Sequence, residues 1–270
     1  LLSVRLDAKY VAILALIGGF LTPPLLSTGV DRPVALFGYI AILNLGLAAT
    51  AIRQKWGFLI GMAALATLGI EVGWTQKFFT VDKVLIPIVA FTAFSVLFMA
   101  VLKLAERFQS EDRWVRISAA GMPLMSMAFA AYLLLFSELG ARPGVVLSYL
   151  FVLDGLVAYL AWMRVDFRSF STIGGLISFF ILLIWTNIHL TPEILPWGLG
   201  FYLVFAVLHA VLPIILQRKY SASKLDLLGF SYPALMLLLM LVPLLKEAAA
   251  PWIVWMFVLC LDLVALVVAV

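Results

Sequence analysis

The chain has 270 residues, of which 65% are hydrophobic and 12% are charged, with a net charge of +4 and a mean hydropathy of +1.16. Soluble domains contain about 45–50% apolar and about 25% charged residues. The composition therefore excludes a water-soluble domain and a disordered chain, and the single cysteine excludes a disulfide scaffold. Apolar runs of about 20 residues recur from end to end, each long enough to cross a hydrocarbon core about 30 Å thick. The sequence predicts a multi-pass membrane protein.

Breaks at charge clusters and at proline or glycine divide the chain into ten apolar segments. We expect an all-α fold, a polytopic bundle of about ten transmembrane helices. The predicted spans are 10–29, 33–52, 56–75, 83–103, 115–137, 143–163, 168–189, 195–217, 227–245 and 251–270.

Lysine and arginine are distributed unevenly between the two ends of these spans. Thirteen of the eighteen basic residues fall on the face that carries the N-terminus, and five fall on the other face. An excess of Lys and Arg in short loops marks the cytoplasmic side of a membrane. We therefore expect both ends of the chain to be cytoplasmic. The five basic residues of the opposite, outer face are Arg32, Lys77, Lys83, Arg142 and Lys246.

A sequence pattern recurs at an offset of 110 residues. An Arg-Pro pair is followed six residues after the proline by tyrosine and then by leucine with a polar residue; a third copy begins at Pro251 with Asp262. The matching residues are Arg32, Pro33, Tyr39 and Asn44 in one copy, and Arg142, Pro143, Tyr149 and Asp154 in the next.

Because one repeat contains four spans, successive copies enter the membrane in the same direction and form parallel repeats. We expect a single transmembrane domain with whole repeats at 33–142 and 143–250 and partial repeats at 1–32 and 251–270. The chain starts at Leu1 and stops at the end of a span. We therefore expect it to be a fragment of a longer polypeptide, in which further repeats adjoin it.

Three segments resemble a known family: GGFLTPPLLSTG (Gly18 to Gly29), YIAILNLGLA (Tyr39 to Ala48) and the basic turn RQKW (Arg53 to Trp56). They are similar to the large bacterial family of predicted membrane proteins called domain of unknown function 2339. The similarity is best over residues 10–75. It implies a longer protein with many more helices, located in the bacterial cytoplasmic membrane, and it implies no activity or catalytic residue.

Four polar residues within the apolar segments are candidates for a polar path. Asp154 lies eleven residues into its span, about 16 Å from its outer end and hence near the bilayer midplane. Acids at that depth are costly and are functional candidates, although a carboxyl group can also hold helices together by hydrogen bonding. Asn44 and Asp262 occupy the equivalent positions of the other copies, and His209 is a proton-relay candidate if it meets either acid. The candidate path is Asp154, Asp262, Asn44 and His209.

Two further features are predicted at the outer membrane edge. Arg32 and Arg142 precede the repeat prolines, where each either fixes a helix end or contributes to an anion-binding ring. In the first span, Gly18 and Gly19 with Pro23 and Pro24 predict a kinked or broken helix whose freed carbonyls need partners.

Aromatic and acidic residues near the outer span ends are predicted to lie at the lipid headgroups. Trp74, Trp185, Trp197 and Trp252 form the predicted interfacial belt. Glu71, near the outer end of its span, is also predicted to be interfacial.

The sequence contains no motif for hydrolytic, nucleotide or metal chemistry. It has two histidines and one cysteine and lacks HExxH, GxxxxGK[ST] and GxGxxG. We therefore predict no catalytic residue, no metal and no cofactor. Dispersed basic residues also disfavour a nucleic-acid partner. The expected partners are the lipid bilayer, other membrane proteins and further repeats of the same chain.

Three functions remain open. We expect a transporter-like or permease-like module whose acid-bearing helices line a polar path. The second hypothesis is a non-catalytic scaffold that packs against membrane proteins or organises the cell envelope. The third is a membrane-embedded lipid or glycan transferase, which the short outer loops disfavour.

Overall fold

A computed structural model describes residues 9–27, 29–220, 227–247 and 251–269, and every regular element among these residues is helical. The chain divides into two compact units, Leu1–Ser126 (unit 1) and Met127–Val270 (unit 2). The all-α prediction is thus confirmed for the described part of the chain.

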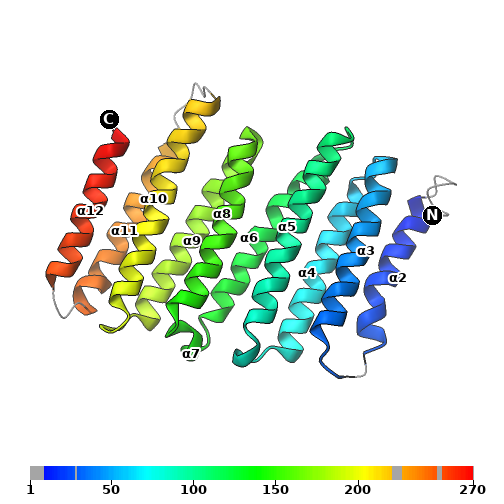
Figure 1. Cartoon of the computed structure of the whole chain (residues 1–270), viewed down its shortest axis with the longest axis horizontal. Coiled ribbons are helices and arrows are strands. Elements are labelled where there is room, and N and C mark those ends of the chain that lie inside the picture. Colours follow the sequence, from blue (N-terminus) through cyan, green and yellow to red (C-terminus); the bar gives the residue numbers. More distant parts are fainter. Residues whose placement is uncertain (1–8, 28, 221–226, 248–250, 270) are drawn as a thin grey trace. The chain divides into compact units, whose positions relative to one another are not determined.

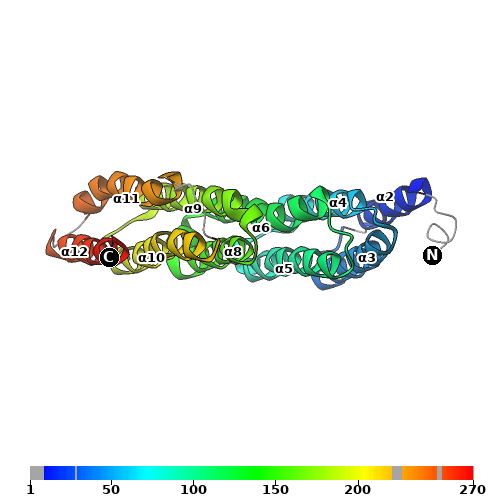
Figure 2. The ribbon, with the colours of Figure 1, turned by 90° about the horizontal axis from the view of Figure 1, so that it is seen from above.

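Unit 1 is a two-layer array of antiparallel helices (Figures 1 and 2). In one layer lie α3 (Pro33–Gln54) and α5 (Leu85–Arg107), and in the other lie α2 (Lys9–Leu25), α4 (Phe58–Phe78) and the part of α6 (Arg113–Leu133) that belongs to this unit. The α4 helix packs against α2, α3 and α5. The ring of Phe37 fills the space between the layers, with ring centroids 5.6 Å from Trp74 and 6.2 Å from Phe94.

Unit 2 has the same construction (Figure 2). One layer contains α8 (Pro143–Met163), α10 (Leu195–Tyr220) and α12 (Pro251–Ala269), and the other contains α9 (Arg168–His189) and α11 (Leu227–Glu247). The α9 helix packs on α8 and α11, and α10 packs on α8, α11 and α12. The buried aromatic residues Phe179, Trp185, Tyr202 and Phe205 form the core between the layers.

Each predicted span contains one long helix, and six of these helices are long and apolar enough to cross a membrane. Proline occupies the first helical position of α3, α8 and α12, where its missing N–H is harmless and its fixed φ suits the helix. The six candidate spans are Pro33–Gln54, Phe58–Phe78, Leu85–Arg107, Pro143–Met163, Val165–His189 and Leu195–Tyr220.

Two predicted boundaries are wrong. The first predicted span, 10–29, ends four residues early, because Pro23 and Pro24 occupy the last turn of α2 and cannot continue its hydrogen-bond pattern. The fifth predicted span, 115–137, ends at Leu133, and a separate short helix, α7 (Ser137–Gly140), follows it. The apolar residues Leu134, Leu135 and Phe136 between the two helices form a turn, which hydropathy does not distinguish from a helix.

Two buried tryptophans anchor the loops that lead into α3 and α8. The indole N–H of Trp74 on α4 donates to Asp31 Oδ1 at 2.9 Å, and that of Trp185 on α9 donates to the Gly140 carbonyl at 2.8 Å. Trp74 is 3% exposed and Trp185 is fully buried. Their predicted place in an interfacial belt is therefore wrong, because each indole nitrogen finds its partner inside the protein. Trp197 and Trp252 are exposed.

The α7 turn allows a close approach that only glycine permits. His189 Nε2 lies 2.7 Å from the Leu134 carbonyl, and this contact holds the imidazole ring directly over Gly140. A Cβ atom at Gly140 would lie 2.3 Å from His189 Nδ1, inside van der Waals contact. In contrast, a Cβ atom at Gly144 in the first turn of α8 would meet no atom within 4 Å.

We predict that Gly140→Ala lowers the free energy of unfolding by about 1–3 kcal/mol, because His189 and Trp185 must shift to admit the methyl group. The matched control Gly144→Ala, only four residues away, should leave the stability unchanged or raise it, because alanine favours the helix. SDS titration of the purified chain in mixed micelles measures both values. Equal stability of the two variants would contradict the close packing of His189 on Gly140.

Candidate functional site

An acid and a histidine meet inside unit 2. The Asp154 Oδ2 atom of α8 lies 2.6 Å from His209 Nε2 of α10. The side chains are 1% and 2% exposed, respectively, and both helices are candidate membrane spans. The pair is neutral overall either as carboxylate and imidazolium or as carboxylic acid and imidazole. Its members can therefore hold or pass a proton without placing net charge in the apolar interior.

Aromatic rings enclose the Asp154–His209 pair. The Phe179 ring of α9 meets the His209 ring edge-on with centroids 5.7 Å apart, and Phe205 packs between Phe151 and Phe179 at 5.4 and 6.5 Å. This surrounding is apolar, so an isolated charge on either group would be strongly disfavoured. Among the described residues, Asp154 Oδ1 has no hydrogen-bond partner. One carboxyl oxygen is thus satisfied by His209, and the other still has the capacity to bind a proton or a polar guest.

The corresponding position of unit 1 carries a neutral pair. Asn44 Nδ2 on α3 donates to Thr67 Oγ1 on α4 at 2.9 Å, and this hydroxyl donates to the Ala63 carbonyl at 2.8 Å. Both side chains are buried, at 2% and 0% exposed. Neither group titrates, so this pair joins α3 to α4 without the proton chemistry that Asp154 and His209 offer.

Of the four predicted path residues, the structure joins two. Asp154 and His209 meet, Asn44 bonds to Thr67, and Asp262 is exposed on α12. The signal that identifies the Asp154 partner was present in the sequence only as a lone histidine within a span. Because α8 and α10 are separated by α9 along the chain, the pairing of Asp154 with His209 is a tertiary feature.

A buried acid in unit 1 was misplaced by sequence reasoning. Glu71 on α4 is 2% exposed, so its predicted interfacial position is wrong, and its Oε1 atom has no hydrogen-bond partner among the described residues. The available signal is the spacing of four that places Thr67, Glu71 and Thr75 on one face of α4. That face is buried along its whole length, which an acid near a span end did not suggest.

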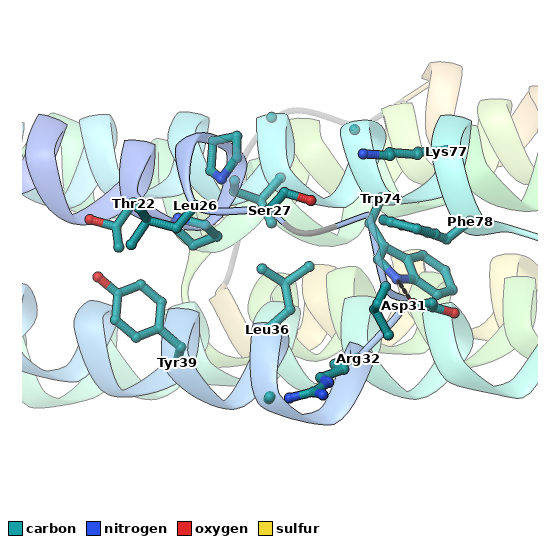
Figure 3. Close-up of a pocket in the computed structure, with 17 residues that line it drawn as sticks. Thr22, Leu26, Ser27, Asp31, Arg32, Leu36, Tyr39, Trp74, Lys77 and Phe78 are labelled. Atoms are coloured by element: carbon teal, nitrogen blue, oxygen red, sulfur yellow. Dashed lines mark hydrogen bonds between the residues drawn. The ribbon is translucent and has the colours of Figure 1, made fainter.

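The predicted helix break and Arg32 lie together at a pocket of about 560 Å³ in unit 1 (Figure 3). Pro23 has no N–H to donate to the Gly19 carbonyl, and the Tyr39 hydroxyl donates to that oxygen at 3.0 Å instead. The Thr22 hydroxyl donates to the Gly18 carbonyl at 2.7 Å. The freed backbone group thus has a protein partner, as a helix end within a membrane requires.

Arg142, the counterpart of Arg32, is exposed ahead of α8 and is not part of this pocket. The equivalent loop of unit 2 contains the α7 helix, whose Gly140 is covered by His189. The described residues contain no group of three or more histidine, cysteine, aspartate or glutamate side chains that could hold a metal ion.

A family model described as "Predicted membrane protein (DUF2339)" matches residues 1–141. No curated protein and no solved structure matches the chain.

The geometry of the buried pair predicts a strong energetic coupling. His209→Leu should lower the free energy of unfolding by about 3 kcal/mol, because it leaves Asp154 buried without its partner. The double variant Asp154→Leu/His209→Leu should return to within about 1 kcal/mol of the wild type, because no polar group then remains. SDS titration in mixed micelles measures this cycle. Additive losses in the double variant would show that the two side chains do not interact.

Proposed function

Because the chain belongs to the DUF2339 family of predicted membrane proteins, we propose that it is a transporter-like module in which the Asp154–His209 pair carries protons. The observation that supports this function is the 2.6 Å contact between a carboxyl group and an imidazole in the middle of two apolar helices. Ionisable groups at this depth are costly to bury, and chains of Asp, Glu and His relay protons in membrane pumps and transporters.

The proposed architecture is a bundle of ten spans built from parallel repeats. Three observations support the repeats. The helices α3 and α8 begin at Pro33 and Pro143, and α5 and α10 begin at Leu85 and Leu195, in both cases 110 residues apart. In addition, an indole N–H anchors the loop before α3 and the loop before α8.

The third observation concerns the loops between α4 and α5 and between α9 and α10. The Thr80 hydroxyl hydrogen-bonds the carboxyl group of Asp82 and lowers its pKa below the ordinary value. Thr191 has the same effect on the pKa of Glu193, 111 residues further along the chain. A Thr-x-acid turn at the same place in both units supports a common origin of the two helix sets.

We further propose that the module lies in the bacterial cytoplasmic membrane with both chain ends on the cytoplasmic side. The excess of Lys and Arg at one end of the helices supports this orientation. In that orientation, the loops anchored by Trp74 and Trp185 face outward. The midplane position of Asp154 then places the pair within reach of either face only through a transient opening of the bundle.

A non-catalytic membrane scaffold is the second candidate, and the Asn44–Thr67 pair favours it. The position that corresponds to Asp154 there carries a group that cannot titrate, yet it is equally buried and also joins two helices. In a scaffold, both pairs serve only to hold helices together. The two functions differ in one measurable respect, because only the first requires Asp154 to bind and release a proton.

Proton uptake by proteoliposomes tests the proposal. The purified chain is reconstituted with an internal pH-sensitive dye, and a potassium gradient with valinomycin sets the membrane potential. We expect proton uptake above that of protein-free liposomes for the wild type. Asp154→Asn should reduce the rate to that of protein-free liposomes, because the amide keeps a hydrogen-bond acceptor for His209 but cannot bind a proton.

Asn44→Ala is the matched control, since it removes the buried polar group at the corresponding position without removing an ionisable one. It should retain proton uptake even if it lowers stability. Wild-type uptake no faster than that of protein-free liposomes, or full uptake by Asp154→Asn, would reject the transporter and leave the scaffold.

A further inference from the structure

The pocket in unit 1 lies where helix ends meet. It is formed by the last turn of α2, the loop that follows it, the first turns of α3 and the last turns of α4 (Figure 3). Its volume of about 560 Å³ is typical of small-molecule sites. Because α3 and α4 are both candidate spans, their ends here lie at the level of the lipid headgroups.

Two cations line this pocket without a counter-charge. Arg32 precedes α3 and Lys77 lies near the end of α4, so they approach from different helices (Figure 3). Neither side chain forms an ion pair with a carboxylate of the described residues. The Lys77 ammonium group lies 5.2 Å from the centroid of the Phe78 ring, which leaves its charge available to a ligand.

The one acid among the lining residues is already engaged. Asp31 Oδ2 accepts a hydrogen bond from Lys83 Nζ at 2.7 Å, and Asp31 Oδ1 accepts one from Trp74 Nε1 at 2.9 Å. Its negative charge is therefore compensated outside the pocket by Lys83. The remaining field in the pocket is that of Arg32 and Lys77, so the site favours an anion.

The rest of the wall is suited to hydrocarbon. Leucine, valine, isoleucine and proline side chains cover the pocket, and two glycines of α4 leave that wall flat, because a Cβ atom at either would meet nothing within 4 Å. The hydroxyl groups of Thr22 and Tyr39, at the end away from Asp31, already donate to backbone carbonyls. The lining residues that carry this apolar surface include Pro24, Leu26, Val30, Leu36, Ile70 and Gly73.

We propose that this pocket binds an amphipathic anion, a membrane lipid whose phosphate group lies between Arg32 and Lys77 and whose acyl chain follows the apolar wall. Arginine and lysine near the membrane surface recognise anionic headgroups, and the wall removes the chain from water. The inference is independent of the proton-carrying pair, which lies in the other unit.

Photo-crosslinking tests the site with a defined probe. The purified chain is placed in phosphatidylcholine nanodiscs that contain a photoactivatable phosphatidylglycerol, and labelled peptides are mapped by mass spectrometry. We expect labels within residues 22–36 and 69–78. Arg32→Gln and Lys77→Gln should each reduce this labelling about fivefold, the factor that corresponds to one cation at a membrane surface.

The matched charge control is Arg142→Gln, which changes an arginine at the corresponding repeat position outside the pocket. It should leave the labelling of residues 22–36 and 69–78 unchanged. A loss equal to that of Arg32→Gln would show that only the overall surface charge attracts the lipid and would overturn the proposal.

A second variant fills the pocket without removing charge. Gly73→Leu places a side chain into open space on α4 and also favours the helix, so the protein should fold as well as the wild type. It should abolish the labelling, whereas Gly46→Leu, an equally open glycine of α3 outside the pocket, should not. Undiminished labelling of Gly73→Leu would overturn the proposal.

Two competition experiments distinguish the source of the anion. Unlabelled phosphatidylglycerol should displace the probe, and inorganic phosphate at millimolar concentration should not, because it cannot use the apolar wall. Displacement by inorganic phosphate would overturn the lipid assignment and identify a free-phosphate site. Equal labelling by a photoactivatable phosphatidylcholine would overturn the requirement for an anion.

Discussion

Polar groups buried among apolar helices need partners within the protein, because the hydrocarbon core offers none. The hydroxyls of Thr67, Ser95 and Thr186 meet this requirement by donating to the carbonyl four residues earlier in their own helices. Where a proline removes a backbone donor, another helix supplies one, as the Tyr39 hydroxyl does for the Gly19 carbonyl. The same requirement draws Trp74 and Trp185 inward, so that side chains expected at the headgroups instead anchor the loops before α3 and α8.

Departures from this rule mark the places where function is sought. Asp154 is paired through one oxygen only, and Glu71 has one oxygen with no partner among the described residues. Both are acids within apolar helices, where an unsatisfied oxygen costs free energy that packing must offset. Asn44 shows the alternative, since an amide at the position that corresponds to Asp154 satisfies its donor on Thr67 and carries no charge. The comparison explains why Asp154, rather than Asn44, is assigned to proton transfer.

The two units use the same loop position differently. Ahead of α3, the loop leaves a pocket lined by Arg32 and Lys77, whereas ahead of α8 the α7 turn is covered by the His189 ring. Correspondingly, the acid–histidine pair occurs in unit 2 and a neutral pair occupies its place in unit 1. If the units are repeats, as we propose, a shared helical framework has been assigned to lipid recognition in one copy and to proton chemistry in the other.

The sequence by itself determined the all-helical class, the approximate ranges of the long helices and the prolines at which α3, α8 and α12 begin. These features follow from hydropathy and from the local geometry of proline, which act over a few residues. The tertiary structure alone decided that His209 meets Asp154, that Glu71 and Trp74 are buried, and that Arg32 faces a pocket with Lys77. Those outcomes depend on which faces of separate helices pack together. The weak amphipathic pattern of helices that are apolar on nearly every side does not encode those faces.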